Sequence, residues 1–473
     1  MKQGTGRYLI RNARIVTPTE IVEGDICLEE GVISYIGLPV EHTDHYEVVD
    51  AAGKYAVPGF VEIHAHGGAG FDLTWGSYDM QRRTFDPSLG NYQDCLARLM
   101  GVLAQHGTTQ ALLSTIAAPL DRLEGVLGEL DCYVRSERNG RDGAMLSGAF
   151  IEGTFIKNPD FAGAQNPRYF CEPKREIFDR LQAAAGGQIR YVNIVPEHGE
   201  VALDLIRHVT AQGVLVGAGH TSSTAEQYRR AVDAGLRIAV HFTNGPTGSS
   251  FKPFGGGSVL QSVLTCHKVY AELIGDGYHV NPSYLMDILY RKTPDRIVAV
   301  TDAFFAAGAT DSIREFEVSG IKGRVSANGE YLQVVGKENT LFGSVLNMRV
   351  AFSNWVSWLT RDMPGIWFDE YAALELDEAV VTTARLCSSN PARALGIYEP
   401  VSRRVNEPID SYCGSLQVGK RADVVLLSLE GEPGKFKAAV HSVFVKGRRV
   451  VGAAGSPNAG AAPLEEQLSP RRA

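Results

Sequence analysis

The sequence has little of what membrane proteins and nucleic-acid-binding proteins need. Its longest apolar runs fall well short of the roughly 20 residues of a membrane-spanning helix, and residues 1–7 contain no signal-type apolar core. Its formal net charge is −8, which argues against a surface for nucleic acids or anionic membranes. We therefore expect a cytoplasmic protein with neither a nucleic-acid partner nor a membrane partner.

Cysteine is also scarce. The seven cysteines are scattered, and none forms a Cys-x-x-Cys pair, so the sequence indicates neither a disulfide framework nor a cysteine zinc site. Hydrophobic residues are plentiful by contrast. They make up 44% of the 473 residues, so the chain can bury the core of a large domain and still supply a second, smaller one.

Apolar runs that end on polar side chains are the most informative feature of the chain. Residues 55–63 form such a run and lead into His64 and His66. In a strand, residues i and i+2 point to the same side, so both imidazoles turn the same way. Four other runs end on a residue able to bind a metal or move a proton: residues 145–151 end on Glu152, 213–219 on His220, 236–240 on His241 and 296–301 on Asp302.

The number of these runs predicts the fold. Three runs without a polar ending, residues 109–114, 190–195 and 269–274, bring the total to eight. Continuous apolar runs separated by helical stretches are typical of strands buried on both faces of a parallel sheet. Eight of them, each with room for a helix after it, predict an α/β fold with a closed (β/α)8 TIM barrel.

The polar strand ends predict a catalytic site. Chemistry in such a barrel lies at the carboxyl ends of the strands, where all six polar residues are placed. Imidazoles and carboxylates that converge can bind a divalent metal. A single polar strand end is often an ordinary cap or loop residue, but five strands that end this way favour a metal site.

The two ends of the chain differ from its middle. Residues 8 to about 56 and 422–450 contain short strands with turn residues between them, and neither set could fold alone. We predict one small β-sandwich domain built from residues 1–57 and 400–452, with a barrel of residues 58–399 inserted between them. The tail, residues 453–473, is predicted to be disordered. Residues 311–342 form a β-rich excursion whose place in the fold the sequence leaves open.

Two helix starts can be predicted inside the barrel. Ser223 begins a capping-box pattern, and the helix that follows is expected to end at Gly235. Asn390 is expected to be an N-cap, with Pro391 at the first helical position.

Several segments resemble the amidohydrolase superfamily. In chain order they are residues 58–68, 151–153, 217–221, 241–244, 276–279, 300–303, 390–392 and 419–424. Over about residues 8 to 450 the sequence is most similar to the N-acetylglucosamine-6-phosphate deacetylase family. The resemblance implies a metal-dependent hydrolase that releases acetate from the nitrogen of an amino-sugar phosphate.

The resemblance also implies a set of metal ligands. Glu152, His220 and His241 would hold the principal ion. His64 and His66 would hold a second ion in those members that have two, with Glu152 as the bridge. Zinc is the expected metal, iron, manganese and cobalt are alternatives, and either one or two ions would be bound. Strand four ends without the lysine that many related enzymes carboxylate, which agrees with a bridging carboxylate from strand three.

Asp302 is the expected general base. An amide is a poor electrophile and water a poor nucleophile, and a metal ion can activate both. A carboxylate beside that ion can take the proton from the water and return it to the departing amine. A further metal ligand and a helix cap are the alternative roles for Asp302.

Contacts with the substrate are implied at six positions, some of which depart from the family pattern. Gln165 stands where the family has a histidine, and Lys252 stands where it has a phosphate-binding arginine. The expected contacts are Ala164, Gln165, Asn244, Gly245, Lys252 and His279. These departures leave deacetylation as the expected activity and leave the exact sugar and its phosphate open.

Other readings of the chain remain open as well. One is an amidohydrolase that acts on another N-acyl or cyclic amide, and another is a scaffold of the same fold without catalysis. Because similar family members are commonly dimers, a homodimer is expected.

Overall fold

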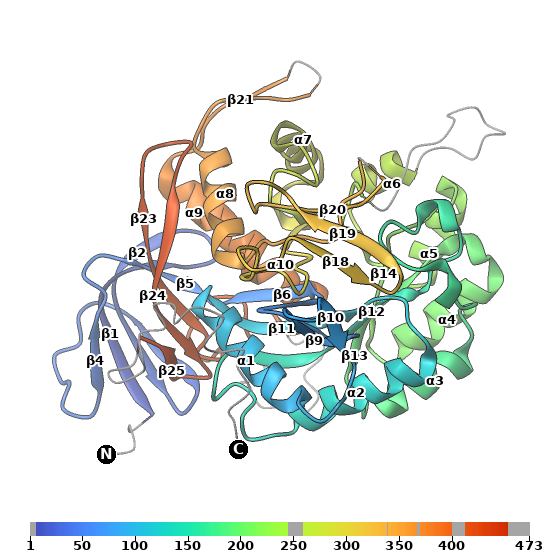
Figure 1. The fold of residues 1–473 in the computed structure, drawn as a ribbon. Coiled ribbons are helices and arrows are strands. Elements are labelled where there is room, and N and C mark those ends of the chain that lie inside the picture. Colours follow the sequence, from blue (N-terminus) through green and yellow to red (C-terminus); the bar gives the residue numbers. More distant parts are fainter. Residues whose placement is uncertain (1–5, 245–258, 338, 367–368, 400–411, 453–473) are drawn as a thin grey trace.

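The computed structural model describes residues 6–244, 259–337, 339–366, 369–399 and 412–452 (Figure 1). Its centre is a sheet of eight parallel strands that adjoin one another in chain order. These strands are β6 (Phe60–Ala65), β11 (Thr108–Thr115), β12 (Met145–Phe155), β13 (Ile189–Ile194), β14 (Leu215–Ala218), β15 (Ile238–Ala239), β16 (Tyr270–Ile274) and β17 (Ile297–Val300). The predicted eight runs all appear as strands, and the predicted α/β barrel is confirmed.

The barrel nearly closes between its first and last strands. The backbone N–H of Asp302 donates to the carbonyl of His64 at 2.8 Å, and Ala65 forms a parallel bridge with Ala303. Closure therefore takes place just beyond the end of β17. It brings the polar ends of the first and last strands into direct contact.

Helices alternate with the strands and cover the outside of the barrel (Figure 1). Several are amphipathic, as in α4, where Ala202, Leu205, Ile206 and Val209 are buried at the spacing of one helix face. The helices are α1 (Tyr92–Gln105), α2 (Leu120–Val134), α3 (Arg175–Ala184), α4 (Glu200–Ala211), α5 (Ala225–Ala234), α6 (Val259–Thr265), α7 (Pro282–Lys292), α8 (Met348–Leu359), α9 (Leu376–Ala384), the π-helical turn η6 (Arg385–Ser389) and α10 (Asn390–Ala394). Within the described part of the chain, none is long and apolar enough to cross a bilayer.

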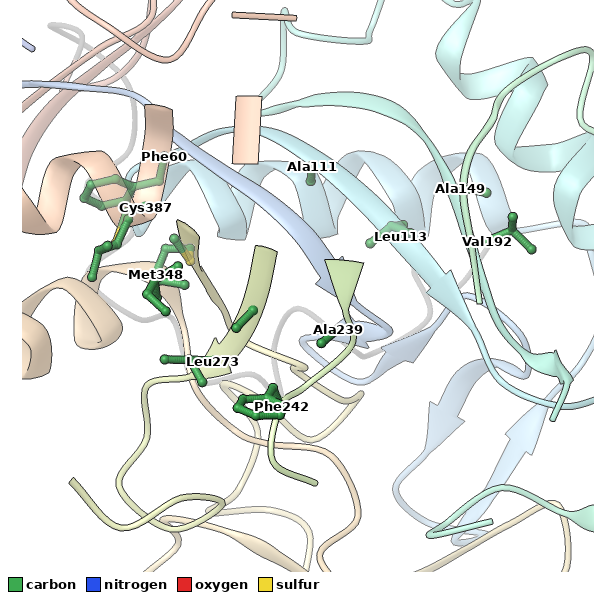
Figure 2. Close-up of a cluster of buried hydrophobic side chains, with 14 of the residues drawn as sticks. Phe60, Ala111, Leu113, Ala149, Val192, Ala239, Phe242, Leu273, Met348 and Cys387 are labelled. Carbon is green, nitrogen blue, oxygen red and sulfur yellow. The ribbon is translucent and has the colours of Figure 1, made fainter. Parts of the chain in front are cut away.

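Neighbouring residues of the strands pack into different hydrophobic clusters. Ala149 and Val192 belong to the layer between strands and helices, part of which Figure 2 shows with Met348 of α8 and Cys387 of η6. Phe150, beside Ala149, belongs to a cluster with members from all eight strands. Successive residues of a strand point to opposite faces of the sheet, and the face turned away from the helices lines the interior, so this second cluster fills the inside of the barrel.

A second sheet contains strands from both ends of the chain. Its order is β25-β24-β23-β5-β1-β2-β3, with β4 paired to β1. We call it the terminal sheet, and its strands are β1 (Arg7–Val16), β2 (Ile21–Glu29), β3 (Val32–Gly37), β4 (Glu47–Asp50), β5 (Tyr55–Pro58), β23 (Val424–Glu430), β24 (Lys437–Val445) and β25 (Arg448–Val451). The predicted domain bounds stay predictions, and the predicted disordered tail lies outside the described residues.

One apolar run serves two sheets. Residues 55–63 were predicted as a single barrel strand, but β5 ends at Pro58 and belongs to the terminal sheet, while β6 begins at Phe60 in the barrel. Gly59 joins them at a point of close approach, where an added Cβ would lie 2.2 Å from the hydroxyl of Thr109. The chain passes between sheets here without a loop.

Three small sheets lie outside the barrel sheet and the terminal sheet in the described part of the chain. The predicted β-rich excursion is a three-stranded antiparallel sheet of β18 (Glu315–Val318), β19 (Ile321–Val325) and β20 (Leu332–Val334). The loop after β6 carries β7 (Gly67–Gly68), β8 (Phe71–Asp72), β9 (Gly76–Asp79) and β10 (Thr84–Asp86), and β21 (Met363–Pro364) pairs with β22 (Glu370–Tyr371) in a hairpin. Phe304, Phe305 and Phe342 are buried with residues of β18 to β20, so this excursion has a hydrophobic core of its own.

Both predicted helix starts need correction. The N-cap of α5 is Thr224, not Ser223, because the Thr224 side chain accepts from the N–H of Gln227 and the Gln227 side chain accepts from the N–H of Thr224. Asn390 is not an N-cap. It continues a helical run from η6, and its amide donates instead to the carbonyls of Pro294 and Ile297.

Candidate metal centre

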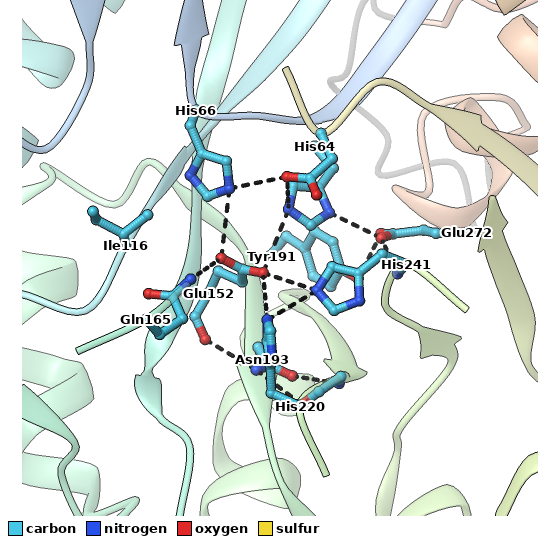
Figure 3. Close-up of polar contacts among 12 residues, drawn as sticks. His64, His66, Ile116, Glu152, Gln165, Tyr191, Asn193, His220, His241 and Glu272 are labelled. Carbon is cyan, nitrogen blue, oxygen red and sulfur yellow. Dashed lines mark hydrogen bonds and ion pairs between the residues drawn. The ribbon is translucent and has the colours of Figure 1, made fainter. Parts of the chain in front are cut away.

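The six polar strand ends form two groups that share one place above the barrel. Glu152, His220 and His241 make one group able to hold a metal ion. His64, His66 and Asp302 make the other. Figure 3 shows Glu152 between the histidines of both groups. The strands thus bring together every residue that the sequence predicted for the metal ligands and the general base.

The first group has the spacing of a metal site. Oε1 of Glu152 lies 3.3 Å from Nε2 of His220 and 3.0 Å from Nε2 of His241, and these two nitrogens are 3.1 Å apart. Ligand atoms about 2.0–2.1 Å from a tetrahedral zinc ion would lie about 3.3–3.4 Å from one another. The three atoms therefore fit around a single ion with only small adjustments.

The second group is more open. Nε2 of His66 lies 3.2 Å from Oδ1 of Asp302, and Nε2 of His64 lies 3.5 Å from the same oxygen. Glu152 faces this group too, with Oε2 at 3.5 Å from Nε2 of His66 and Oε1 at 3.7 Å from Nε2 of His64. Nε2 of His64 is buried and has no hydrogen-bond partner among the described residues. A carboxylate between two groups of imidazoles can bridge a pair of ions, so the residues also fit a second ion.

The carboxylates of the centre favour positively charged groups beside them. Burial alone would lower the pKa of His64, but the carboxylates of Asp302, Glu272 and Glu152 raise it to about 10. Burial alone would raise the pKa of Asp302, but the neighbouring His64 and His66 lower it to about 2. Glu152 behaves in the same way, and contacts with its histidines hold its pKa well below the usual range despite burial. The carboxylates are therefore ionised at neutral pH and can receive a cation.

The backbone is strained where three of these residues leave their strands. The φ angles of His220, His241 and Asp302 are 53°, 30° and 50°. Positive φ values are uncommon for residues other than glycine and tend to cluster at functional sites. Each turn aims a side chain across the barrel mouth. Three of the six residues of the centre thus have positive φ angles.

Buried groups behind the histidines were missed by the sequence reasoning. Nδ1 of His64 lies 3.0 Å from Oε2 of Glu272, and Nδ1 of His220 lies 2.8 Å from the carbonyl of Phe161. Each contact engages one ring nitrogen and leaves Nε2 toward the centre. The one signal for Glu272 in the sequence was a lone carboxylate in the middle of an apolar run.

Gln165 is held by two groups of the protein. Its Nε2 donates to Oε2 of Glu152 at 2.5 Å, and its Oε1 accepts from the N–H of Ala117 at 2.7 Å. The amide therefore orients Glu152 and also lines the cavity described next. One amide hydrogen remains for a further partner.

A cavity of about 370 Å³ opens above the metal ligands. Residues from the excursion form part of its wall, among them Leu341 and Phe342. Of the predicted substrate contacts, Ala164, Gln165, Asn244 and His279 line it. The other two, Gly245 and Lys252, lie outside the described residues. This volume suits a small organic molecule.

His279 is fixed by a carboxylate on the same loop. Its Nδ1 lies 2.6 Å from Oδ2 of Asp276, and its own N–H donates to Oδ1. Burial alone would lower the pKa of His279, but the charge of Asp276 raises it. The ring is held at the cavity wall with a positive charge favoured.

Comparison with known proteins identifies the family. No family model matches the chain. An N-acetylgalactosamine-6-phosphate deacetylase of Escherichia coli O157:H7 is 31% identical over 427 residues, which cover 89% of this chain and 95% of that protein. An N-acetylglucosamine-6-phosphate deacetylase of Bacillus subtilis (strain 168) is 27% identical over 431 residues, 90% of this chain and 94% of that protein. The chain belongs to the amino-sugar-phosphate deacetylases.

Solved structures of this deacetylase family share the fold over nearly the whole chain. A mutant N-acetyl-D-glucosamine-6-phosphate deacetylase of Mycobacterium smegmatis, in complex with N-acetyl-D-glucosamine-6-phosphate, has a TM-score of 0.74 at 25% identity, covering 94% of this chain and 99% of that one. An enamidase of the amidohydrolase superfamily shares the fold alone, at 14% identity and a TM-score of 0.55. This deacetylase-family chain is therefore a hydrolase of carbon–nitrogen amide bonds, and it has two groups of residues able to hold a metal ion.

Proposed function

We propose that the protein removes the acetyl group from N-acetylglucosamine 6-phosphate, or from a close relative such as N-acetylgalactosamine 6-phosphate, to give acetate and the amino-sugar phosphate. The observation that carries the proposal is the position of Glu152 between two groups of imidazoles, with Asp302 across the same cavity. The names of the most similar relatives support the choice of substrate.

The metal in this proposal is zinc, with iron, manganese and cobalt as alternatives. Glu152, His220 and His241 would hold the principal ion, and His64 and His66 would hold a second one. Imidazole and carboxylate donors suit zinc, and a divalent ion held here polarises an amide carbonyl and makes water acidic enough to ionise near neutral pH.

Asp302 moves the proton in the proposed reaction. Its carboxylate is ionised and faces the cavity beside His66, so it can accept a proton from the attacking water. As the carbon–nitrogen bond breaks, the same group returns that proton to the amine nitrogen. Acetate and the free amino sugar are then the products, and Asp302 is again ionised.

Substrate contacts in this proposal surround the sugar. Asn244 and Ala164 line the cavity, and Gln165 offers its remaining amide hydrogen. Lys252 and His279 would bind the 6-phosphate by their positive charge, and Gly245 would contact the sugar beside Asn244. A lysine supplies a point charge rather than the two-pronged contact of an arginine.

Acetate release from four sugars tests the substrate. N-acetylglucosamine and N-acetylgalactosamine should each be compared with and without a 6-phosphate. We expect the phosphorylated sugars to be preferred. A protein that prefers the unphosphorylated sugars, or hydrolyses none of the four at full metal content, would move the function to another N-acyl or cyclic amide, or to a scaffold without catalysis.

Lys252→Ala tests the phosphate contact itself. The charge acts on a part of the substrate remote from the amide, so its loss should lower kcat/KM for the phosphorylated sugar and spare the plain one. Removal of one charge-assisted contact costs roughly 1.5–3 kcal/mol, or about one to two powers of ten. Equal losses on both sugars would exclude this role for Lys252.

The same proposal includes a cytoplasmic location and a homodimer. The scattered cysteines agree with a reducing compartment. Light scattering after size-exclusion chromatography measures the oligomeric state directly, and the mass of a single chain would exclude the dimer.

A further inference from the structure

Glu272 is a fully buried carboxylate in the middle of β16. Three donors converge on it. The Tyr191 hydroxyl donates to Oε1 at 2.7 Å, and the backbone N–H of His241 donates to Oε2 at 3.0 Å. The third partner is Nδ1 of His64, also 3.0 Å from Oε2 (Figure 3). A buried polar group is costly unless it is hydrogen-bonded, and both oxygens of Glu272 have partners.

The contact with Glu272 decides which nitrogen of His64 is free. Nδ1 donates its proton to the Glu272 carboxylate, so Nε2 is the ring nitrogen that remains to offer a lone pair to a metal ion, which would displace any proton held there. Nε2 is buried without a hydrogen-bond partner among the described residues, and it faces Glu152 at 3.7 Å and Asp302 at 3.5 Å. These distances are too long for hydrogen bonds, and they leave room for a cation between the three groups.

Aromatic packing holds the same ring in place. Phe150 meets His64 edge to face, with ring centroids 4.8 Å apart, and Tyr191 stacks on Phe150 with ring centroids 3.8 Å apart. Tyr191 thus supports His64 by packing through Phe150 and by its hydrogen bond to Glu272. The ring cannot turn without breaking a buried ion contact.

We propose that Glu272 is a positioning residue that fixes His64 as a ligand of the second metal ion and ties it to the strand that carries His241. The inference rests on the proposed function, because it concerns an ion that the deacetylase site would bind. It assigns no contact with the substrate to Glu272. A carboxylate behind a metal-bound histidine sets the orientation of the ring and raises its basicity.

The Glu272→Gln variant keeps the shape of the side chain but cannot carry a negative charge. The glutamine oxygen can still accept from His64 and His241, and its amide can donate to Tyr191, whose hydroxyl can reverse to accept. The three hydrogen bonds therefore survive while the negative charge is lost. Glu272→Ala removes both. Loss of a group behind a metal ligand typically weakens metal affinity roughly 10–100-fold.

The experiment measures bound zinc per chain and its affinity by competition with a chelator. We expect Glu272→Gln to bind one of the two ions roughly 10–100-fold more weakly, and Glu272→Ala to lose that ion. Glu62→Gln is the matched control. Glu62 is equally buried and accepts from the backbone N–H groups of His64 and Thr301, but it touches no imidazole nitrogen, so its variant should keep the metal of the parent even if stability falls.

A double-mutant cycle shows whether Glu272 acts through His64. In a His64→Ala background, Glu272→Gln should weaken metal binding no further. A further loss in that background would mean that Glu272 acts through the backbone of His241. That result, or parent-like affinity in Glu272→Gln, would overturn the inference. If Glu272→Ala fails to fold, Tyr191→Phe removes one partner of the carboxylate and should still lower the affinity for the same ion.

Failure of the proposed function would look different. A parent protein that binds no divalent metal, or that binds metal but releases no acetate, would overturn the deacetylase proposal. A parent that does both while Glu272→Gln keeps both ions would overturn only the role of Glu272.

Discussion

Among single side chains, Asp302 is the one to which the proposed reaction assigns two proton transfers. We expect Asp302→Asn to lower kcat on the order of 10²–10⁴-fold, because the amide keeps the shape of the side chain but cannot accept the proton. Asparagine tolerates the positive φ of 50° at this position better than most residues, so the backbone should be preserved. The measurement is acetate release at saturating substrate.

The metal content of the same variant is its control. Oδ1 of Asp302 lies 3.2 Å from His66, and an asparagine oxygen can occupy the same place. We therefore expect the ions to remain. Substantial turnover at unchanged metal content would exclude Asp302 as the general base, and loss of an ion would assign it to the metal instead.

Helix α5 offers a test at the level of one element. Thr224 caps its first turn by accepting from the N–H of Gln227. Thr224→Ala leaves that N–H unpaired and should lower the free energy of unfolding by about 1 kcal/mol, within a range of about 0.5–2 kcal/mol. Urea denaturation measures the change. Thr224→Ser keeps the hydroxyl and should match the parent, and equal losses in the two variants would mean that the cap contributes little.

Helix α1 ends at a histidine that should make stability depend on pH. Burial, helped by the positive charge of Arg349, lowers the pKa of His106 from 6.5 to about 4. Below pH 6.5 the unfolded chain therefore binds a proton that the folded chain does not. The free energy of unfolding therefore decreases as the pH is lowered below 6.5. The decrease ends near pH 4, where His106 of the folded protein also becomes protonated.

His106→Gln isolates this effect from the other titrating groups. Between about pH 7 and pH 5 the parent should lose roughly 2 kcal/mol more stability than the variant. The free energy of unfolding at both pH values, measured for both proteins, gives the difference. A parent and variant with parallel pH profiles would show that His106 is protonated in the folded protein.

Strand ends were easier to predict than strand interiors. A polar residue at the end of an apolar run stands out, and all strands of a barrel end at the same rim, so the positions of His64 and Asp302 followed from the pattern. Glu152 was found in the same way, although β12 continues past it to Phe155. Glu272 lies inside its run, where five apolar neighbours outweigh one carboxylate. Its partners Tyr191 and His64 are 81 and 208 residues away in the sequence. A pattern among neighbouring residues cannot indicate a contact between residues so far apart.

Element boundaries failed where tertiary contacts decided them. Pro58 and Gly59 divide an apolar run between two sheets, and although the predicted domain boundary fell beside this Pro-Gly pair, the apolar residues on both sides favoured one continuous strand. Asn390 has the sequence of an N-cap, but the carbonyls of Pro294 and Ile297 compete for its amide and the helix continues through it. Local propensity was overridden in both cases by contacts with distant strands.

At the scale of the whole molecule, a metal ion bound at the centre should stabilise the folded barrel by linking several of its strands. Its ligands come from β6 at one edge of the barrel sheet, from β12, and from the ends of β14 and β15. An ion that binds only the folded chain stabilises it by about 2.7 kcal/mol at a free concentration 100 times its Kd. We expect the thermal unfolding temperature to fall when a chelator removes the metal and to rise with added zinc.

The His220→Ala variant is the comparison for this stabilisation by the metal ion. It removes a ligand of the principal ion, so zinc should stabilise this variant much less than the parent. Hydrogen exchange in β6 and β14 should also respond to zinc in the parent, since these strands carry ligands of different groups. An unfolding temperature that does not depend on zinc in the parent would show that the folded barrel gains nothing from the ion.

The pairing of β5 with β23 sets the order in which the protein can be completed during translation. β5 emerges from the ribosome before the barrel, while β23, β24 and β25 emerge after it. Until then one edge of β5 has no neighbour, and an unpaired edge can recruit strands from other chains. A nascent chain interrupted before Val424 would carry a complete set of barrel strands beside an incomplete sheet. The exposed edge of β5 is therefore covered only when β23, β24 and β25 have been synthesised. We expect chaperones to be needed most in the interval before that.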